Sequence, residues 1–308
     1  MVRGYVGISI LLWFSFTSCY LALARSISLG ENTQMSDKNS SFFIPVRRFT
    51  KTQDEGSNII SHYAMWHTVP GEYYGLRAEI SIWGSPNQKD SQESGASLQI
   101  YCKDGGNYNL IEVGFHVSPS LYHNRDVRFF TYWTKDSRSA GCYNLQCPGF
   151  VPTRGAALVP GQAVTPPSSY GEQDRYVRLS LNKDPNSGDW VVYRHDLETP
   201  SFLGYFPIEL CPKMPVKLAL TGFVNYLNNT EGPPMGSGHF PDMESSNKKI
   251  AYFKHIKKYN SGGHAYDPIL VKMLYYVDRP DCYIESDFVP AWNEGYIFHY
   301  GGPSGCIG

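Results

Sequence analysis

Short segments in which apolar and polar side chains alternate recur along this chain, and they restrict the folds open to it. Residues 77–83 (RAEISIW) place Ala78, Ile80 and Ile82 on one side, and residues 97–102 (SLQIYC) alternate in the same way. Because successive side chains of a strand point to opposite faces, each segment predicts a strand with one buried face. Further such segments lie at 111–117, 128–134, 176–181, 190–195, 217–227, 251–259, 271–277 and 296–300. Many short strands separated by turns predict an all-β sandwich or barrel.

Composition agrees with this fold class and excludes some functions. The 23 Tyr, 16 Phe, 29 Gly and 21 Pro favour strands and turns over long helices. The formal net charge is -1, so no basic surplus indicates nucleic-acid binding. We expect no nucleic-acid partner and no cofactor.

The N-terminus predicts export. Residues 1–24 have the features of a signal peptide: Arg3 near the start, an apolar run at 6–16, and an Ala22-Leu23-Ala24 cleavage site. The alternative is a membrane anchor, but the apolar run is short for a spanning helix. The mature chain would then be a secreted, extracellular protein without a membrane segment.

The remaining chain reads as one domain behind a short leader. Residues 25–61 are polar and weakly patterned, which indicates a linker or a truncated pro-segment. Strand signals recur after this point, so we expect a single β domain at 62–308. Asn39 and Asn228 begin N-x-S/T sequons and are predicted glycosylation sites.

An even number of cysteines remains after the signal peptide, which in an exported chain predicts disulfides. Fifteen pairings are possible for six cysteines. Closure between sequence neighbours favours Cys142–Cys147 and Cys282–Cys306, with Cys102–Cys211 as the remainder. A zinc site is the competing interpretation, but no C-x-x-C or H-x-x-x-H spacing supports it, and no metal is expected.

Glu112 is the residue that most needs a chemical explanation. It lies in the apolar segment 111–117, on the opposite face from Ile111 and Val113 and on the same face as Gly114 and His116. A glycine in a strand leaves room for another backbone to approach closely. Without further information, an exposed strand carboxylate is as good an explanation of Glu112 as a catalytic one.

Several ordered motifs resemble the neprosin family of secreted plant proteins, formerly described as a domain of unknown function. The most specific are GCYNLQCPGFV (141–151), MGSGHFP (235–241) and YGGP (300–303), joined by IPVRR (44–48), ISIW (80–83), QIY (99–101), IEVGF (111–115) and FTYWT (130–134). The resemblance extends from Ile44 to the C-terminus. It implies an antiparallel β-sandwich of two sheets with a concave cleft. It also implies a glutamic peptidase that cleaves next to proline in acid, usually behind a pro-segment, which here is short.

A glutamic peptidase of this type needs two carboxylates, one to take a proton from water and one to act as an acid. Glu112 matches the first family motif. The second, W-G-G-E-V-V, corresponds to 220–225 and places Phe223 where the glutamate belongs. No Asp or Glu lies between Pro212 and Thr230. We therefore expect weak or lost activity, because the acid partner is missing.

Two functions from different classes remain open. The first is an altered prolyl endopeptidase. The second is a catalytically inactive family member, a pseudoenzyme, that binds proline-rich peptides or cell-wall glycans in the same cleft. The predicted cleft residues are Gln99, Tyr101, His116, Tyr132 and Trp133. His116 is a weak candidate for a substitute acid, and His239 is expected to be a structural loop residue.

Overall fold

The computed structural model describes residues 58–104, 107–136, 140–214, 216–241 and 249–308. The described residues all belong to one compact unit, Ser40–Gly308. The predicted signal peptide, the sequon at Asn39, the IPVRR motif and residues 25–57 of the predicted leader therefore lie outside the described residues.

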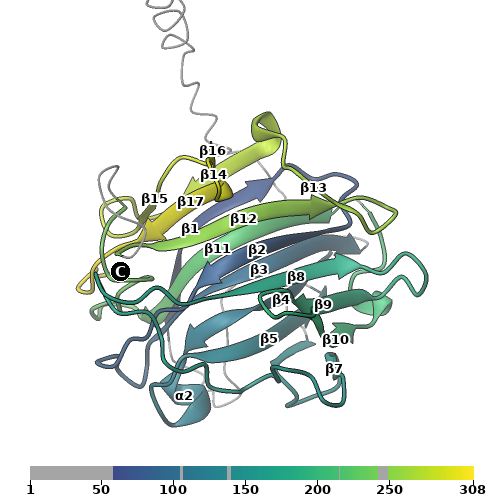
Figure 1. Ribbon diagram of the computed structural model, residues 1–308. Coiled ribbons are helices and arrows are strands. Elements are labelled where there is room, and N and C mark those ends of the chain that lie inside the picture. The colour runs from purple at the N-terminus through teal and green to yellow at the C-terminus, as the bar shows by residue number, and fades with distance from the viewer. Residues whose placement is uncertain (1–57, 105–106, 137–139, 215, 242–248) are drawn as a thin grey trace, which may run out of the picture. The chain divides into compact units, whose positions relative to one another are not determined.

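Two antiparallel sheets form the described part of the chain, and Figure 1 shows one lying over the other. The first, sheet A, has seven strands in the order β14 (Met273–Val277), β1 (Ile59–Thr68), β11 (Val216–Leu227), β3 (Glu93–Asp104), β4 (Asn107–Val117), β5 (Arg128–Lys135) and β6 (Ala140–Tyr143). Strand β1 begins at Ile59.

Sheet B has ten strands within the described residues. Its main path runs β15 (Ile284–Glu285), β17 (Gly295–Gly301), β12 (Ala251–Tyr259), β2 (Gly75–Ser81), β8 (Tyr176–Lys183), β9 (Trp190–Arg194), β10 (Ser201–Phe206) and β7 (Val151–Pro152); β13 (Ala265–Tyr266) pairs with β12, and β16 (Val289–Ala291) pairs with β17. Helical turns are short: α2 (Pro119–Tyr122), η2 (Ile208–Leu210) and η3 (Leu270–Lys272).

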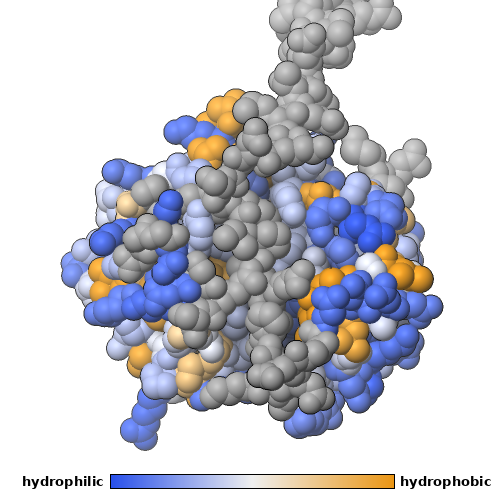
Figure 2. Space-filling model, turned by 180° about the vertical axis from the view of Figure 1, so that it is seen from behind, coloured by the Kyte–Doolittle hydropathy of each residue, from blue (hydrophilic) through white to orange (hydrophobic). Residues whose placement is uncertain are grey.

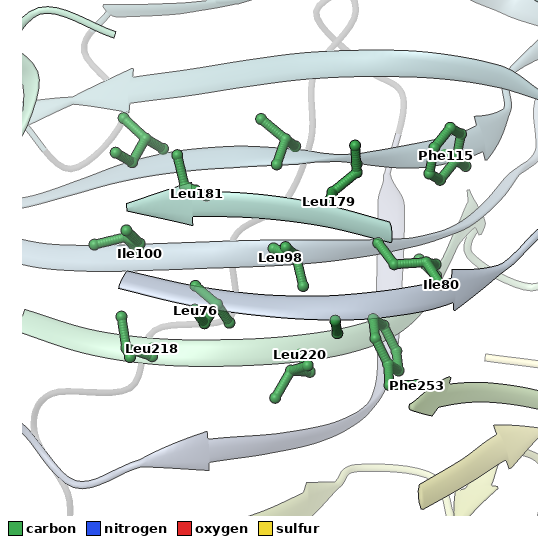
Figure 3. Close-up of a cluster of buried hydrophobic side chains, with 14 of the residues drawn as sticks. Leu76, Ile80, Leu98, Ile100, Phe115, Leu179, Leu181, Leu218, Leu220 and Phe253 are labelled. Atoms are coloured by element: carbon green, nitrogen blue, oxygen red, sulfur yellow. The ribbon is translucent and has the colours of Figure 1, made fainter. Parts of the chain in front are cut away.

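The core lies between the two sheets, and alternation explains its composition. Leu98 and Ile100 of β3 point towards sheet B, and Leu76, Ile80 and Leu179 point back from β2 and β8 (Figure 3). Burying each such side chain contributes about 1.5–3 kcal/mol. The expected antiparallel β-sandwich of two sheets is confirmed.

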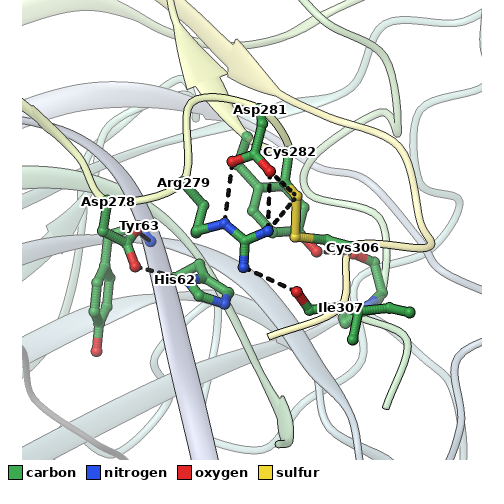
Figure 4. The surroundings of a disulfide bond; sticks show 10 residues. His62, Tyr63, Asp278, Arg279, Asp281, Cys282, Cys306 and Ile307 are labelled. Atoms are coloured by element: carbon green, nitrogen blue, oxygen red, sulfur yellow. Dashed lines mark hydrogen bonds and ion pairs between the residues drawn. A yellow bond between two sulfur atoms is a disulfide. The ribbon is translucent and has the colours of Figure 1, made fainter. Parts of the chain in front are cut away.

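The structure contains all three expected disulfides, Cys102–Cys211, Cys142–Cys147 and Cys282–Cys306. The cysteines are therefore not zinc ligands. The Cys282–Cys306 bond lies in a polar cluster (Figure 4), where Arg279 pairs with Asp281 and donates to the Ile307 carbonyl. Close by, Asp278 accepts from the Tyr63 amide. These contacts tie the C-terminal segment to β1.

The surface carries scattered hydrophobic side chains. In the parts of Figure 2 that show described residues, the hydrophobic residues form separate groups among hydrophilic ones. Leu145, Val271 and Trp292 are among the exposed large hydrophobics and come from different parts of the chain. No helix in the described part of the chain is long and apolar enough to cross a membrane.

Candidate functional site

Glu112 lies on the face of sheet A that points away from sheet B. Its neighbours Ile111 and Val113 belong to the core between the sheets. We call the opposite side of sheet A the Glu112 face. Its buried apolar side chains are Tyr63, Met65, Tyr101, Leu110, Phe130, Tyr132, Tyr143, Ala219 and Phe223. Its polar side chains include Glu93, Gln99, Glu112, His116, Lys217, Thr221 and Asn225, all buried. This placement rests on strand alternation and register.

Gln99 pairs with Glu112 across β3 and β4, and its side chain contacts the carboxylate. The Gln99 Nε2 group donates to Glu112 Oε1 at 2.9 Å and to Ser97 Oγ at 3.1 Å. Gln99 Oε1 accepts from the Tyr101 hydroxyl at 2.7 Å and from Thr221 Oγ1 at 3.0 Å. Both hydrogens and both lone pairs of the Gln99 amide are thus engaged. The amide is locked with its N–H directed at Glu112.

This arrangement gives Glu112 a defined orientation on a rigid strand. The side chain is 0% exposed, and Tyr132 lies beside it on β5. An ionised carboxylate held in this way can accept a proton from a bound water. Gly114 is also explained, because a Cβ there would lie 2.1 Å from the Ala96 carbonyl oxygen of the neighbouring strand.

Phe223 lies on the same face but not directly across from Glu112. The residue opposite Gln99 on β11 is Ala219, and Phe223 stands opposite Gly95. It is four residues further along β11 and two strands from Glu112, which separates the two Cα atoms by roughly 16 Å at ~3.3 Å per residue and ~4.8 Å per strand. The Phe223 ring lies over Gly95, where a Cβ would be 2.6 Å from Cζ. It meets Phe130 edge-on at 6.1 Å.

A second carboxylate on this face, Glu93, was missed in the sequence. Glu93 Oε1 lies 2.5 Å from His116 Nδ1, and Glu93 Oε2 accepts from Asn225 Nδ2 at 2.7 Å. Glu93 opens β3, six residues before Gln99, which is ~20 Å along the strand. Its carboxylate therefore does not join Glu112. Continuing the alternation of 97–102 backwards through Gly95 would have placed Glu93 on this face.

His116 is the centre of that second cluster. Its Nε2 lies 2.8 Å from the Tyr122 hydroxyl, and its ring stacks on Phe130 at 4.1 Å. The Asn144 amide, from the GCYNLQCPGFV motif, donates to the same Tyr122 oxygen at 2.9 Å. His116 is on the predicted face, but it stands four residues from Glu112 along β4. It is thus bonded to Glu93 and Tyr122, away from the Glu112–Gln99 pair.

The Glu112 face also carries a buried histidine and a buried lysine, and His67 lies in the cross-strand row of Ala219, Gln99 and Glu112. His67 is 4% exposed and Lys217 2% exposed. Burial, and then the nearby Lys217 charge, lower the pKa of His67 to about 3. His67 is therefore neutral in the folded protein except in strong acid.

Trp133, predicted as a cleft residue, does not share the Glu112 face. It pairs with Ile111 and packs against the core between the sheets, because it is one residue out of phase with Tyr132. Its indole lies over Gly149.

The loop residue His239 stacks on Tyr170 at 3.9 Å. The MGSGHFP motif that contains His239 joins the YGGP motif through a bridge between Met235 and Gly302. Gln99, Tyr101, His116 and Tyr132 do share the Glu112 face.

The fold and site together define a two-sheet antiparallel sandwich with a buried carboxylate on an aromatic-rich outer face. The family model described as Neprosin matches residues 90–303. The chain belongs to the Neprosin family.

Solved structures of peptidases resemble the chain at low identity. Scytalido-glutamic peptidase with a peptide-based transition-state analogue has 7% identity and a TM-score of 0.38, covering 80% of this chain and 100% of that one. SCP-B, a member of the Eqolisin family of peptidases, in a complex with the tripeptide Ala-Ile-His, has 8% identity and a TM-score of 0.37, covering 79% and 98%.

Proposed function

We propose that this chain is an exported protein that binds peptide on the Glu112 face, with proline-rich segments as its preferred class, and that its peptidase activity is weak or absent. The observation that carries the proposal is the Gln99 network. It orients one carboxylate, Glu112, while the position aligned with the family's second glutamate carries Phe223.

The chemistry of peptide hydrolysis explains the expected weakness. Glu112 can act as the base for water. Protonation of the leaving amine needs an acid, and a phenyl ring cannot supply one. The other carboxylate of this face, Glu93, is engaged with His116 and Asn225. Loss of a positioned acid typically costs about 10²–10⁴ in rate.

Peptide binding is supported by the side chains of the face. Tyrosines on three strands, Tyr63, Tyr101 and Tyr132, combine apolar area with a polar tip, which suits a peptide. All three are buried in this structure, so peptide binding requires this face to become accessible. Export is supported by the three disulfides, which persist in oxidising compartments, together with the predicted signal peptide.

The test compares the chain from Arg25 with three variants on a fluorogenic proline-rich peptide, between about pH 2.5 and 7, where carboxylates titrate. Glu112→Gln removes the base, Phe223→Glu restores a carboxylate, and Phe223→Gln is the uncharged control of the same size. We expect slow or no cleavage by the parent and none by Glu112→Gln. We expect Phe223→Glu to gain little over Phe223→Gln, because roughly 16 Å separates the Cα atoms of residues 223 and 112.

Peptide binding is measured separately by calorimetry on Glu112→Gln, which cannot turn over. Binding without cleavage in the parent would identify a non-catalytic binder. Efficient cleavage by the parent that survives Glu112→Gln would refute the role of Glu112. A gain of about 10²-fold in Phe223→Glu over Phe223→Gln would show that residue 223 reaches the reacting group, and would refute this geometry.

A further inference from the structure

Strand β14 forms one edge of sheet A within the described residues (Figure 1). Proteins normally protect free sheet edges with very short strands, proline or charged side chains, because an open edge pairs with other strands. The other edge strands follow this rule: β7, β13 and β15 have two residues each, β16 contains Pro290, and β6 has four residues and a glycine. Strand β14 has five residues, MLYYV, none of which is charged, proline or glycine. It is therefore the least protected edge of the described sandwich.

The register between β1 and β14 shows which backbone groups of β14 face the open side. The Tyr63 amide of β1 donates to Asp278, which follows β14. Because the backbone groups of successive residues point to opposite sides of a strand, the odd-numbered residues of β1 bond to β14, and they pair with its even-numbered residues. The N–H and C=O groups of Met273, Tyr275 and Val277 therefore face away from β1. No other strand of the described residues pairs with β14.

Exposed apolar side chains lie along the same edge. Tyr275 is 40% exposed, and Val271, two residues before the strand, is 88% exposed. Leu270 is exposed as well. The Tyr275 ring lies 6.0 Å from the ring of Trp66, which also contacts Phe288. An unprotected strand edge flanked by exposed apolar side chains is typical of an interaction surface.

The charges that flank β14 indicate that its partner is a second copy of this chain. When two β14 strands pair antiparallel and are centred on Tyr275, Met273 of one copy lies opposite Val277 of the other. The same register brings Lys272, just before the strand, beside Asp278 of the other copy, just after it. Lys272 is exposed and forms no ion pair with any described residue, and the Asp278 side chain is 23% exposed. Opposite charges thus meet at both ends of the paired strands.

We propose that β14 is a homodimerisation surface, at which two copies pair antiparallel about a two-fold axis through Tyr275. The outward backbone groups of Met273, Tyr275 and Val277 form the hydrogen bonds between the copies. The two Tyr275 rings become cross-strand neighbours, and Lys272 and Asp278 pair at each end. Because the axis is perpendicular to the sheet, the Glu112 faces of both copies lie on the same side of one continuous sheet. The proposal does not depend on the activity of Glu112.

The test is analytical ultracentrifugation of the chain from Arg25 over a range of concentrations. A pair of five-residue strands with short flanks is a small interface, and small interfaces are usually weak. We therefore expect a reversible equilibrium between monomer and dimer, with a Kd of about 1–100 µM. Lys272→Glu places like charges at both ends of the pair and should raise this Kd by about fivefold.

Two substitutions of Tyr275 separate the role of its backbone from that of its side chain. Tyr275→Pro removes an N–H group that faces the open edge and leaves the hydrogen bonds to β1 in place. Tyr275→Thr removes the ring but keeps the N–H group, and it is the matched control. We expect Tyr275→Pro to weaken dimerisation at least about tenfold, and Tyr275→Thr less than about fivefold. Circular dichroism checks that both variants are folded.

A cross-linking experiment tests the register without relying on the proline variant. Tyr275→Cys should link to its counterpart in the second copy through a short bismaleimide. Val151→Cys, at an exposed position of the edge strand β7, should not form such a link. The proposal is overturned by a chain that stays monomeric up to about 300 µM, by dimerisation that folded Tyr275→Pro leaves unchanged, or by equal cross-linking at residues 275 and 151.

Discussion

Buried histidines lower the stability of this fold in acid, and the size of the effect can be calculated for His67. Its pKa falls from 6.5 to about 3 on folding, first because it is buried and second because of Lys217. Between these values the unfolded chain binds a proton that the folded chain does not. The free energy of unfolding therefore has its full value above about pH 6.5 and decreases as the pH falls towards 3.

The magnitude follows from the pH interval. At about pH 5 the imidazole of the folded protein is still neutral, and the pH is about 1.5 units below the pKa of the imidazole in the unfolded chain. Since one unit is worth ~1.4 kcal/mol, His67 should cost about 2 kcal/mol of stability at that pH. His195 and His299, whose pKa values burial lowers to about 4, act in the same direction. The acidic part of the proposed assay range thus coincides with a loss of stability of the fold.

Urea unfolding of the parent and His67→Gln from about pH 8 to 4 measures the effect, because only the parent carries this titration. The difference in unfolding free energy between them should shift by about 2 kcal/mol from pH 8 to 5. His123→Gln, at an exposed position, is the control and should follow the parent. A constant difference between parent and His67→Gln across the pH range would refute the reasoning.

Three further outcomes are expected in denaturation experiments. Gly114→Ala should destabilise by about 3 kcal/mol or more, because its Cβ meets backbone that cannot move away; a change below ~1 kcal/mol would contradict this packing. Replacing both cysteines of the Cys102 bond should cost about 3 kcal/mol more than replacing both of the Cys142 bond, because the sequence separations are 109 and 5. The reverse order would contradict the loop-entropy argument. Glu93→Gln should destabilise by about 1–3 kcal/mol through loss of a buried charged hydrogen bond, and unchanged stability would show that this contact contributes nothing.

Local patterns in the sequence predicted the elements of the fold well. Alternation places side chains with a period of two, which depends only on the strand itself. It assigned Ile111 and Val113 to the core and Glu112 and His116 to the other face. It also shows that Trp133, adjacent to Tyr132, cannot share that face. The Cys142–Cys147 and Cys282–Cys306 disulfides followed from closure between sequence neighbours, because short loops are the easiest to close. The pairing of Cys102 with Cys211, which are 109 residues apart, came from the structure.

The partners on each face were decided by the tertiary structure alone. Glu93 meets Asn225, 132 residues away, and Thr221 helps to lock Gln99 against Glu112. Such contacts depend on which strands become neighbours and in which register, and the packing of the whole sheet decides both. The sequence by itself therefore determined that Glu112 lies outside the core, and only the folded sheet determined which groups act on it.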